Sequence, residues 1–285
     1  MGSKDRALPV IALLFVGVAL LGLILRLKII PTWPLEHDES VHLLFAWRLN
    51  GLGEFTYHPW RHGPLLYYVS ALVLPLAEWG HHAARTLTVG LSMSAFVGLF
   101  WLRHWLGTWG ALAASLLFAV HYYTAWIATY FRNDGPLLGI WLCGLAVTAF
   151  YIDQPTKARA GAVGGIIAIA FAIKETTFVL GFAALVSAVL WYLLQHGVSS
   201  QPLKSYWSKY ARPLIPVGGV IFMLGIVLFF TGWPPSLPRI LNAPAQWLSA
   251  IEWWTTPSKM IRARVGPLRY AKLLLSSPVL MLVAL

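Results

Sequence analysis

Acidic and histidine side chains gather in one part of this sequence, between residues 31 and 83. The whole chain has ten Asp and Glu residues, and Glu36, Asp38, Glu39 and Glu54 all stand here. A carboxylate can take a proton from a reacting hydroxyl, and carboxylates with imidazoles can bind a cation or a substrate. The neighbouring residues that could take part are His37, His42, Tyr57, His58 and His62. The sequence therefore predicts a reactive or binding site, and the alternative is an ordinary solvated loop.

The spacing of two histidines excludes a zinc-protease motif in this stretch. That motif needs histidines four residues apart on one helix face, whereas His37 and His42 are five apart. At about 3.6 residues per turn, the second ring is rotated off the shared face. Asp38 and His42 are four apart and can face the same site. These two side chains could together hold one cation or one hydroxyl group.

Two further polar turns interrupt the apolar sequence. The first, at 130–136, contains Arg132 and Asp134, and the second is the dipeptide Lys174-Glu175. Charged pairs beside lipid usually neutralise each other, which is the simple explanation. Ionisable groups also cluster at functional sites, so three such turns meeting on one face would favour a site.

The composition shows which elements must position these residues. Hydrophobic residues make up 58% of the chain, charged residues 11%, and the mean hydropathy is +0.68. A soluble domain of this size does not have that balance, so we expect an all-α, polytopic integral membrane protein. The net charge of +11 comes from basic residues between apolar stretches, which argues against a nucleic-acid partner. The single cysteine, Cys143, excludes a disulfide framework and a cysteine metal cluster.

About eight apolar stretches are long enough to cross a membrane, which takes roughly 20 residues. We predict spans at 7–30, 84–102, 108–127, 134–152, 158–173, 176–195, 213–232 and 268–285. The shorter stretch 64–77 opens with Gly63-Pro64 and contains Pro75, which favours an interfacial or re-entrant helix.

These spans predict one transmembrane domain over 1–285. It has a first extracytoplasmic loop at 31–83, which carries interfacial helices and the acidic motif, and a second, larger one at 233–267. Because the chain ends inside the apolar run 273–285, a C-terminal truncation stays open.

The basic residues predict the orientation. If 64–77 does not cross the membrane, three basic loops fall on the same side as Lys4 and Arg6 and the acidic turns fall on the other side, whereas a crossing would remove this separation. Cytoplasmic loops carry the excess of Lys and Arg, so we expect a multi-pass cell-membrane protein with a cytoplasmic N-terminus and an extracytoplasmic site. Arg26 and Lys28 end the first span on the outer side, where we expect both side chains to snorkel toward the headgroups.

The ordered set of polar motifs resembles a known group of enzymes. An acidic pair after the first span, His-Gly-Pro before an interfacial helix, Arg-Asn-Asp and Lys-Glu recur together in the GT-C membrane glycosyltransferases. Within them, the chain looks most like the protein O-mannosyltransferase type (glycosyltransferase family 39), and specifically the prokaryotic "flippase activity-associated" Agl-type family. The resemblance rests on 36–39, 57–68, 130–134 and 174–175, and it covers about 5–200. Beyond that range the similarity fades.

The resemblance implies transfer of a sugar, with inversion, from a polyprenyl-phosphate donor in the membrane lipid to a glycan, lipid or protein acceptor. It implies Asp38 as the base, with Glu39 orienting the acceptor or helping to bind a cation. The implied substrate-binding residues are His37, His42, Tyr57, His58, His62, Arg132, Asp134, Lys174, Glu175, Arg262 and Arg264, the basic ones facing the phosphate. The resemblance leaves the need for a cofactor open, and Asp38, His42 and Asp134 could hold a divalent metal ion.

Two other functions compete with this interpretation. A lipid-linked-sugar flippase, or a non-catalytic component associated with one, would use the same outer carboxylates to bind its cargo. An ion- or proton-coupled transporter would place its ionisable residues near the middle of its spans. Because the charged residues here stand at span ends, the sequence disfavours a transporter.

Overall fold

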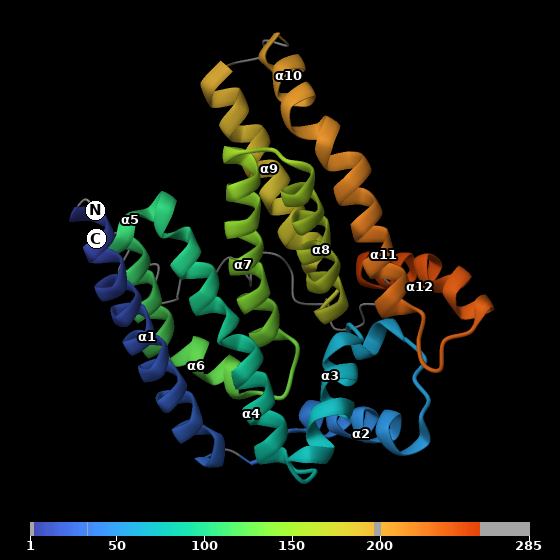
Figure 1. The fold of residues 1–285 in the computed structure, drawn as a ribbon. Helices are drawn as coiled ribbons and strands as arrows, with labels where there is room; N and C mark the ends of the chain where they lie inside the picture. The colour runs from blue at the N-terminus through green and yellow to red at the C-terminus, as the bar shows by residue number, and fades with distance from the viewer. Residues whose placement is uncertain (1–2, 33, 197–200, 257–285) are drawn as a thin grey trace.

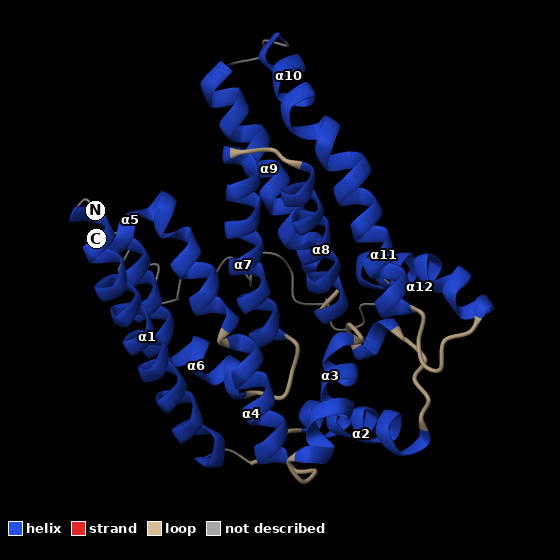
Figure 2. Ribbon diagram, in the orientation of Figure 1, coloured by secondary structure: helices blue, strands red, loops and turns tan. Residues whose placement is uncertain are grey.

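The computed structural model describes residues 3–32, 34–196 and 201–256, and in these ranges the chain is helical (Figure 1). Figure 2 shows loops only as connections between helices, with no strand in the part described. An antiparallel bridge joins Phe55 to Trp233. The predicted all-α class is confirmed.

Long helices alternate with short ones along the chain. In order, they are α1 (Ser3–Ile29), η1 (Ile30–Thr32), α2 (His37–Leu52), η2 (Pro59–Arg61), α3 (Leu65–Val73), η3 (Leu74–Leu76), α4 (His81–Ser92), α5 (Ser94–Val120), α6 (Tyr122–Thr129), α7 (Asp134–Asp153), α8 (Lys157–Ile173), α9 (Thr177–His196), α10 (Gln201–Tyr206), η4 (Trp207–Ala211), η5 (Leu214–Gly218), α11 (Gly219–Phe230) and α12 (Leu237–Thr255). In Figure 1, α2 and α12 run across the direction of the long helices.

Five helical stretches among the described residues are long and apolar enough to cross a membrane. They are Pro9–Thr32, His81–Val120, Asp134–Asp153, Thr177–Gln195 and Lys204–Phe230. The protein is therefore a multi-pass membrane protein, but the count of eight spans is not confirmed. The predicted span at 158–173 corresponds to α8, which has 17 residues and is shorter than these five. The predicted span at 268–285 lies outside the described residues.

The stretch His81–Val120 folds back on itself at Gly107. This residue has φ of 72° inside α5, a left-handed backbone that suits glycine. Phe96 and Phe118 pack with ring centroids 5.2 Å apart, although 22 positions separate them. A straight helix would place them about 33 Å apart. The stretch therefore holds two segments packed side by side, and the predicted span at 108–127 is divided between the end of α5 and α6.

The predicted interfacial segment is a short apolar helix. It runs over Leu65–Leu76, well below the length of a membrane crossing. A buried apolar cluster joins Tyr67 of α3 to Phe55 and Tyr57 of the first loop and to Phe230 of α11. The first loop is thus fixed against the long helices, which gives its polar residues a defined position.

Arg26 does not snorkel as expected. Its side chain is fully buried and donates hydrogen bonds to the carbonyl oxygens of Phe118, at 2.8 Å, and Ala119, at 3.2 Å. These carbonyls belong to the last turn of α5, where helix carbonyls lack partners within the helix. The unsatisfied end of a neighbouring helix explains why the guanidinium turns inward, whereas Lys28 is exposed.

Candidate functional site

Three turns that are far apart in the sequence bring four charged side chains together. Asp38 lies in the first turn of α2, Arg132 precedes α7, and Asp134 is the first residue of α7. Lys174 directly follows α8. Arg132 Nη1 lies 3.2 Å from Asp38 Oδ2, and Arg132 Nε lies 3.7 Å from Asp134 Oδ2. Lys174 Nζ donates a hydrogen bond to Asp134 Oδ1. Arg132 therefore connects the acidic turn of α2 to the other two turns.

The two carboxylates of this group remain accessible. The Asp38 side chain is 39% exposed and that of Asp134 30%, whereas Lys174 is 11% exposed. Two cations and two carboxylates balance each other in charge. An anionic ligand can bind the N–H donors of Arg132 and Lys174 that these carboxylates leave open, or it can replace a carboxylate as their partner, and a replaced carboxylate would become free to act.

Glu39, next to Asp38, has a different environment. It is fully buried, and its carboxylate accepts two hydrogen bonds from Arg85, from Nε at 2.9 Å and from Nη2 at 2.6 Å. It also accepts from the backbone N–H of Phe131 at 2.8 Å and of Glu36 at 3.2 Å. These four contacts occupy the carboxylate. Glu39 thus fixes the start of α2 against the turn that carries Arg132.

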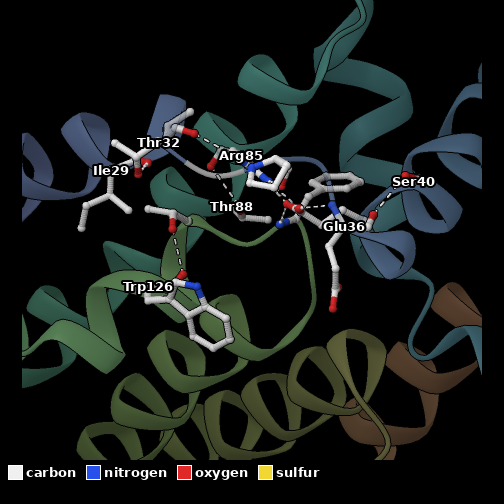
Figure 3. Close-up of polar contacts among 12 residues, drawn as sticks. Ile29, Thr32, Glu36, Ser40, Arg85, Thr88 and Trp126 are labelled. Atoms are coloured by element: carbon white, nitrogen blue, oxygen red, sulfur yellow. Dashed lines mark hydrogen bonds and ion pairs between the residues drawn. The ribbon is translucent and has the colours of Figure 1, made fainter.

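Arg85 is a central residue of this arrangement that the sequence interpretation missed. Besides Glu39, its guanidinium donates to the carbonyl oxygens of Ile30, at 3.0 Å, and Pro34, at 2.9 Å. It thereby ties α4 to the connection between α1 and α2 (Figure 3). One sequence signal could have found it, because an arginine inside a predicted apolar span requires a buried partner.

The environment of the Glu39 carboxyl makes the stability of the fold depend on pH. Burial opposes its ionisation, but the hydrogen bonds from Arg85, Phe131 and Glu36 outweigh burial and hold the pKa below its ordinary value of 4.5. Because the folded-state pKa is the lower one, the ionised group stabilises the fold at higher pH, and this contribution is lost as the pH falls through the folded-state pKa.

We therefore expect Glu39→Gln to be less stable than the wild type at neutral pH and the gap to close below about pH 4.5. Thermal unfolding in detergent across a pH series measures this difference. A gap that stays constant into acid would contradict the assignment.

Glu175 contacts two other residues that the sequence predicts to bind substrate. It is fully buried, its Oε1 accepts a hydrogen bond from the Tyr57 hydroxyl at 2.6 Å, and its Oε2 lies 3.4 Å from His62 Nδ1. Burial and the negative charge of Glu175 raise the pKa of Tyr57, so the phenol stays protonated. A Cβ at Gly63 would overlap the carbonyl oxygen of Ala172, so glycine lets this turn reach the end of α8. The close approach brings His62 to Glu175.

The remaining predicted residues lie in different surroundings. His42 is buried, and its Nδ1 lies 2.6 Å from the Tyr67 hydroxyl. His58 packs its ring against Trp253, with centroids 5.7 Å apart, and His37 is exposed at the start of α2. Two further predicted residues lie outside the described part of the chain, Arg262 and Arg264.

The predicted metal site does not match the arrangement of its three residues. Within the part of the chain that the structure describes, no three His, Cys, Asp or Glu side chains are grouped to hold a metal ion. Arg132 is ion-paired to both Asp38 and Asp134. The cation that joins the two carboxylates is thus an arginine side chain.

The fold and the site define a multi-pass, all-α membrane protein whose ionised groups meet where three helices begin or end. Residues 61–230 match the family of dolichyl-phosphate-mannose-protein mannosyltransferases. The match covers more than half of the chain, and the chain belongs to this family. It is therefore a membrane glycosyltransferase of the GT-C type, which confirms the resemblance at that level. No curated protein and no solved structure matches the chain.

Proposed function

We propose that this protein transfers a sugar, with mannose as the first candidate, from a polyprenyl-phosphate donor to a hydroxyl group of a glycan, lipid or protein acceptor. The reaction proceeds with inversion at the extracytoplasmic face of the cell membrane, and the N-terminus is cytoplasmic. One transmembrane domain spans the chain, with outer loops at 31–83 and 233–267. The observation that carries the proposal is the ion-paired group of Asp38, Arg132, Asp134 and Lys174.

Asp38 is the base in this mechanism. Its carboxylate takes the proton of the acceptor hydroxyl while that oxygen forms a bond to the anomeric carbon of the sugar. The bond from the anomeric carbon to the phosphate oxygen breaks, and polyprenyl phosphate leaves with the electron pair. Because a phosphate leaving group needs little protonation, one carboxylate is sufficient. The exposed position of Asp38 allows it to reach an acceptor.

Arg132 and Lys174 bind the phosphate. Charge-assisted hydrogen bonds from cationic side chains stabilise the negative charge that grows on the leaving group. Both cations are paired with carboxylates here, and in this mechanism the incoming phosphate replaces Asp38 as a partner of Arg132. The donor itself thereby frees the base. Glu39, buried against Arg85, acts as a positioning residue.

Incubating the purified protein with a panel of polyprenyl-phosphate sugars tests this function. We expect released polyprenyl phosphate with at least one donor and an acceptor extract. Arg132→Gln should reduce that release by roughly 10- to 1,000-fold, because such a charged donor contributes to the transition state. Arg48→Gln is the matched control, since Arg48 is an exposed arginine on α2. No release from any donor by a folded protein would overturn the proposal and favour a flippase-associated role.

A further inference from the structure

His42 is the most enclosed imidazole of the site. It lies one helical turn after Asp38 on α2, so the two side chains share a face. Only 5% of the surface of His42 is exposed. Its Nδ1 lies 2.6 Å from the Tyr67 hydroxyl, and its ring stacks on that of His62 with centroids 6.1 Å apart. The ring is therefore held in one orientation by α3 and by the turn before it.

A second hydrogen bond of the Tyr67 hydroxyl determines which ring nitrogen of His42 carries the hydrogen. The Tyr67 hydroxyl donates to the carbonyl oxygen of Arg61 at 2.6 Å. A phenol has only one proton to donate, so towards His42 the Tyr67 oxygen is an acceptor. His42 Nδ1 must then carry the hydrogen. In a neutral ring, this leaves Nε2 with a lone pair and no hydrogen.

The surroundings keep this ring neutral. Burial, followed by repulsion from His62 and Arg132, lowers the pKa of His42 to about 3, with Lys174 acting in the same direction and Asp38 against it. His42 therefore does not become a cation near neutral pH. Arg132 and Lys174 can only donate hydrogen bonds, whereas Nε2 of a neutral His42 can only accept one. Such an acceptor suits a neutral group that donates, and a sugar or acceptor hydroxyl is the obvious one.

We propose that Tyr67 fixes His42 in the Nδ1–H tautomer, so that Nε2 accepts a hydrogen bond from a hydroxyl group of a substrate beside Asp38. His42 is then a specificity-determining residue and Tyr67 a positioning residue. The identity of the substrate rests on the proposed function, but the tautomer does not. The two sources of the hydroxyl are the sugar of the donor and the acceptor.

The tautomer can be measured without any substrate by NMR of the protein with isotope-labelled histidine. The His42 signals are assigned by their loss in His42→Gln. We expect a neutral ring with hydrogen on Nδ1 between about pH 5 and pH 8, and a mixture of tautomers in Tyr67→Phe, which removes the oxygen that Nδ1–H binds. Hydrogen on Nε2 in the wild type, or an imidazolium in this range, would overturn the proposal even if the protein proved to be a transferase.

A pair of substitutions tests the role of Nε2. The amide of His42→Gln reaches towards the Nε2 position, whereas that of His42→Asn stops near the Nδ1 position. We expect kcat/KM for transfer from polyprenyl-phosphate mannose to a threonine-containing peptide to fall roughly 10- to 100-fold in His42→Asn and less in His42→Gln. Thermal unfolding of both variants shows whether they fold. Tyr67→Phe is an independent variant, because it changes the tautomer of His42 without replacing the histidine.

Two binding measurements distinguish the sources of the hydroxyl. A weaker Kd of His42→Asn for polyprenyl-phosphate mannose identifies a hydroxyl of the sugar. An unchanged donor Kd with a raised KM for the peptide identifies the acceptor hydroxyl. If neither constant changes in a folded His42→Asn protein, Nε2 binds no substrate and the proposal is wrong. The donor Kd can be measured without turnover. This measurement therefore tests the role of His42 even if the protein does not catalyse the proposed transfer reaction.

Discussion

Replacing Asp38 by Asn is expected to lower turnover by about 10²- to 10⁴-fold, the usual contribution of a positioned general base. The amide has nearly the same shape but cannot take the proton of the acceptor hydroxyl. Arg132 also loses one of its two carboxylate partners, which leaves it more available to phosphate. Donor binding should therefore be retained while kcat falls. Single-turnover transfer and an equilibrium donor-binding assay separate the two effects.

The matched control for this experiment is Glu54→Gln. Glu54 is an exposed acid of the same first loop, and the described structure shows no ion pair for it. Its replacement should leave both turnover and donor binding unchanged. Near-normal turnover of Asp38→Asn would remove Asp38 from the role of base. A variant without transfer that still supports export of a lipid-linked sugar would favour the flippase-associated alternative.

The second large effect is expected on stability, from Arg85→Met. Methionine fills a similar volume but leaves the buried Glu39 carboxylate without its ionic partner. Removing one partner of a buried ion pair costs about 3–5 kcal/mol, mainly because the other charge stays buried and uncompensated. The free energy of unfolding in mixed micelles, measured as a function of denaturant, gives the size of the loss.

Two comparisons make this prediction specific. Arg48→Met removes an exposed arginine and should change the free energy of unfolding by less than about 0.5 kcal/mol. Combining Arg85→Met with Glu39→Gln should cost clearly less than the two single losses together, because the second change removes the uncompensated charge. Strict additivity would show that Arg85 stabilises the fold through its carbonyl contacts and not through Glu39.

The Arg85–Glu39 pair also connects stability with function. Phe131, whose N–H binds Glu39, directly precedes Arg132, and Asp38 directly precedes Glu39. A shift of this pair would therefore change the distance between the proposed base and the phosphate-binding arginine. We infer that variants of Arg85 lose activity through geometry, although Arg85 itself is not part of the Asp38–Arg132 contact.

The sequence by itself determined the class of the protein and the turns that carry its charges. Hydropathy is summed over consecutive residues, so membrane-length helices and the short helix Leu65–Leu76 can be found locally. The polar turns with Asp38, Arg132 and Lys174 stood out because ionised groups are rare in such a chain. Their resemblance to the GT-C enzymes depended on their order, which is also a property of the sequence.

Only the tertiary structure decided which of these groups pair. Glu39 and Arg85 are 46 positions apart, and Tyr57 and Glu175 are 118 apart. No local pattern indicates that such side chains meet, because their contact depends on how helices pack and where the chain reverses. For the same reason, Arg26 turned to the end of α5 and not to the headgroups. Burial and hydrogen bonding at these contacts are set by packing, and hydropathy along the chain does not contain that information.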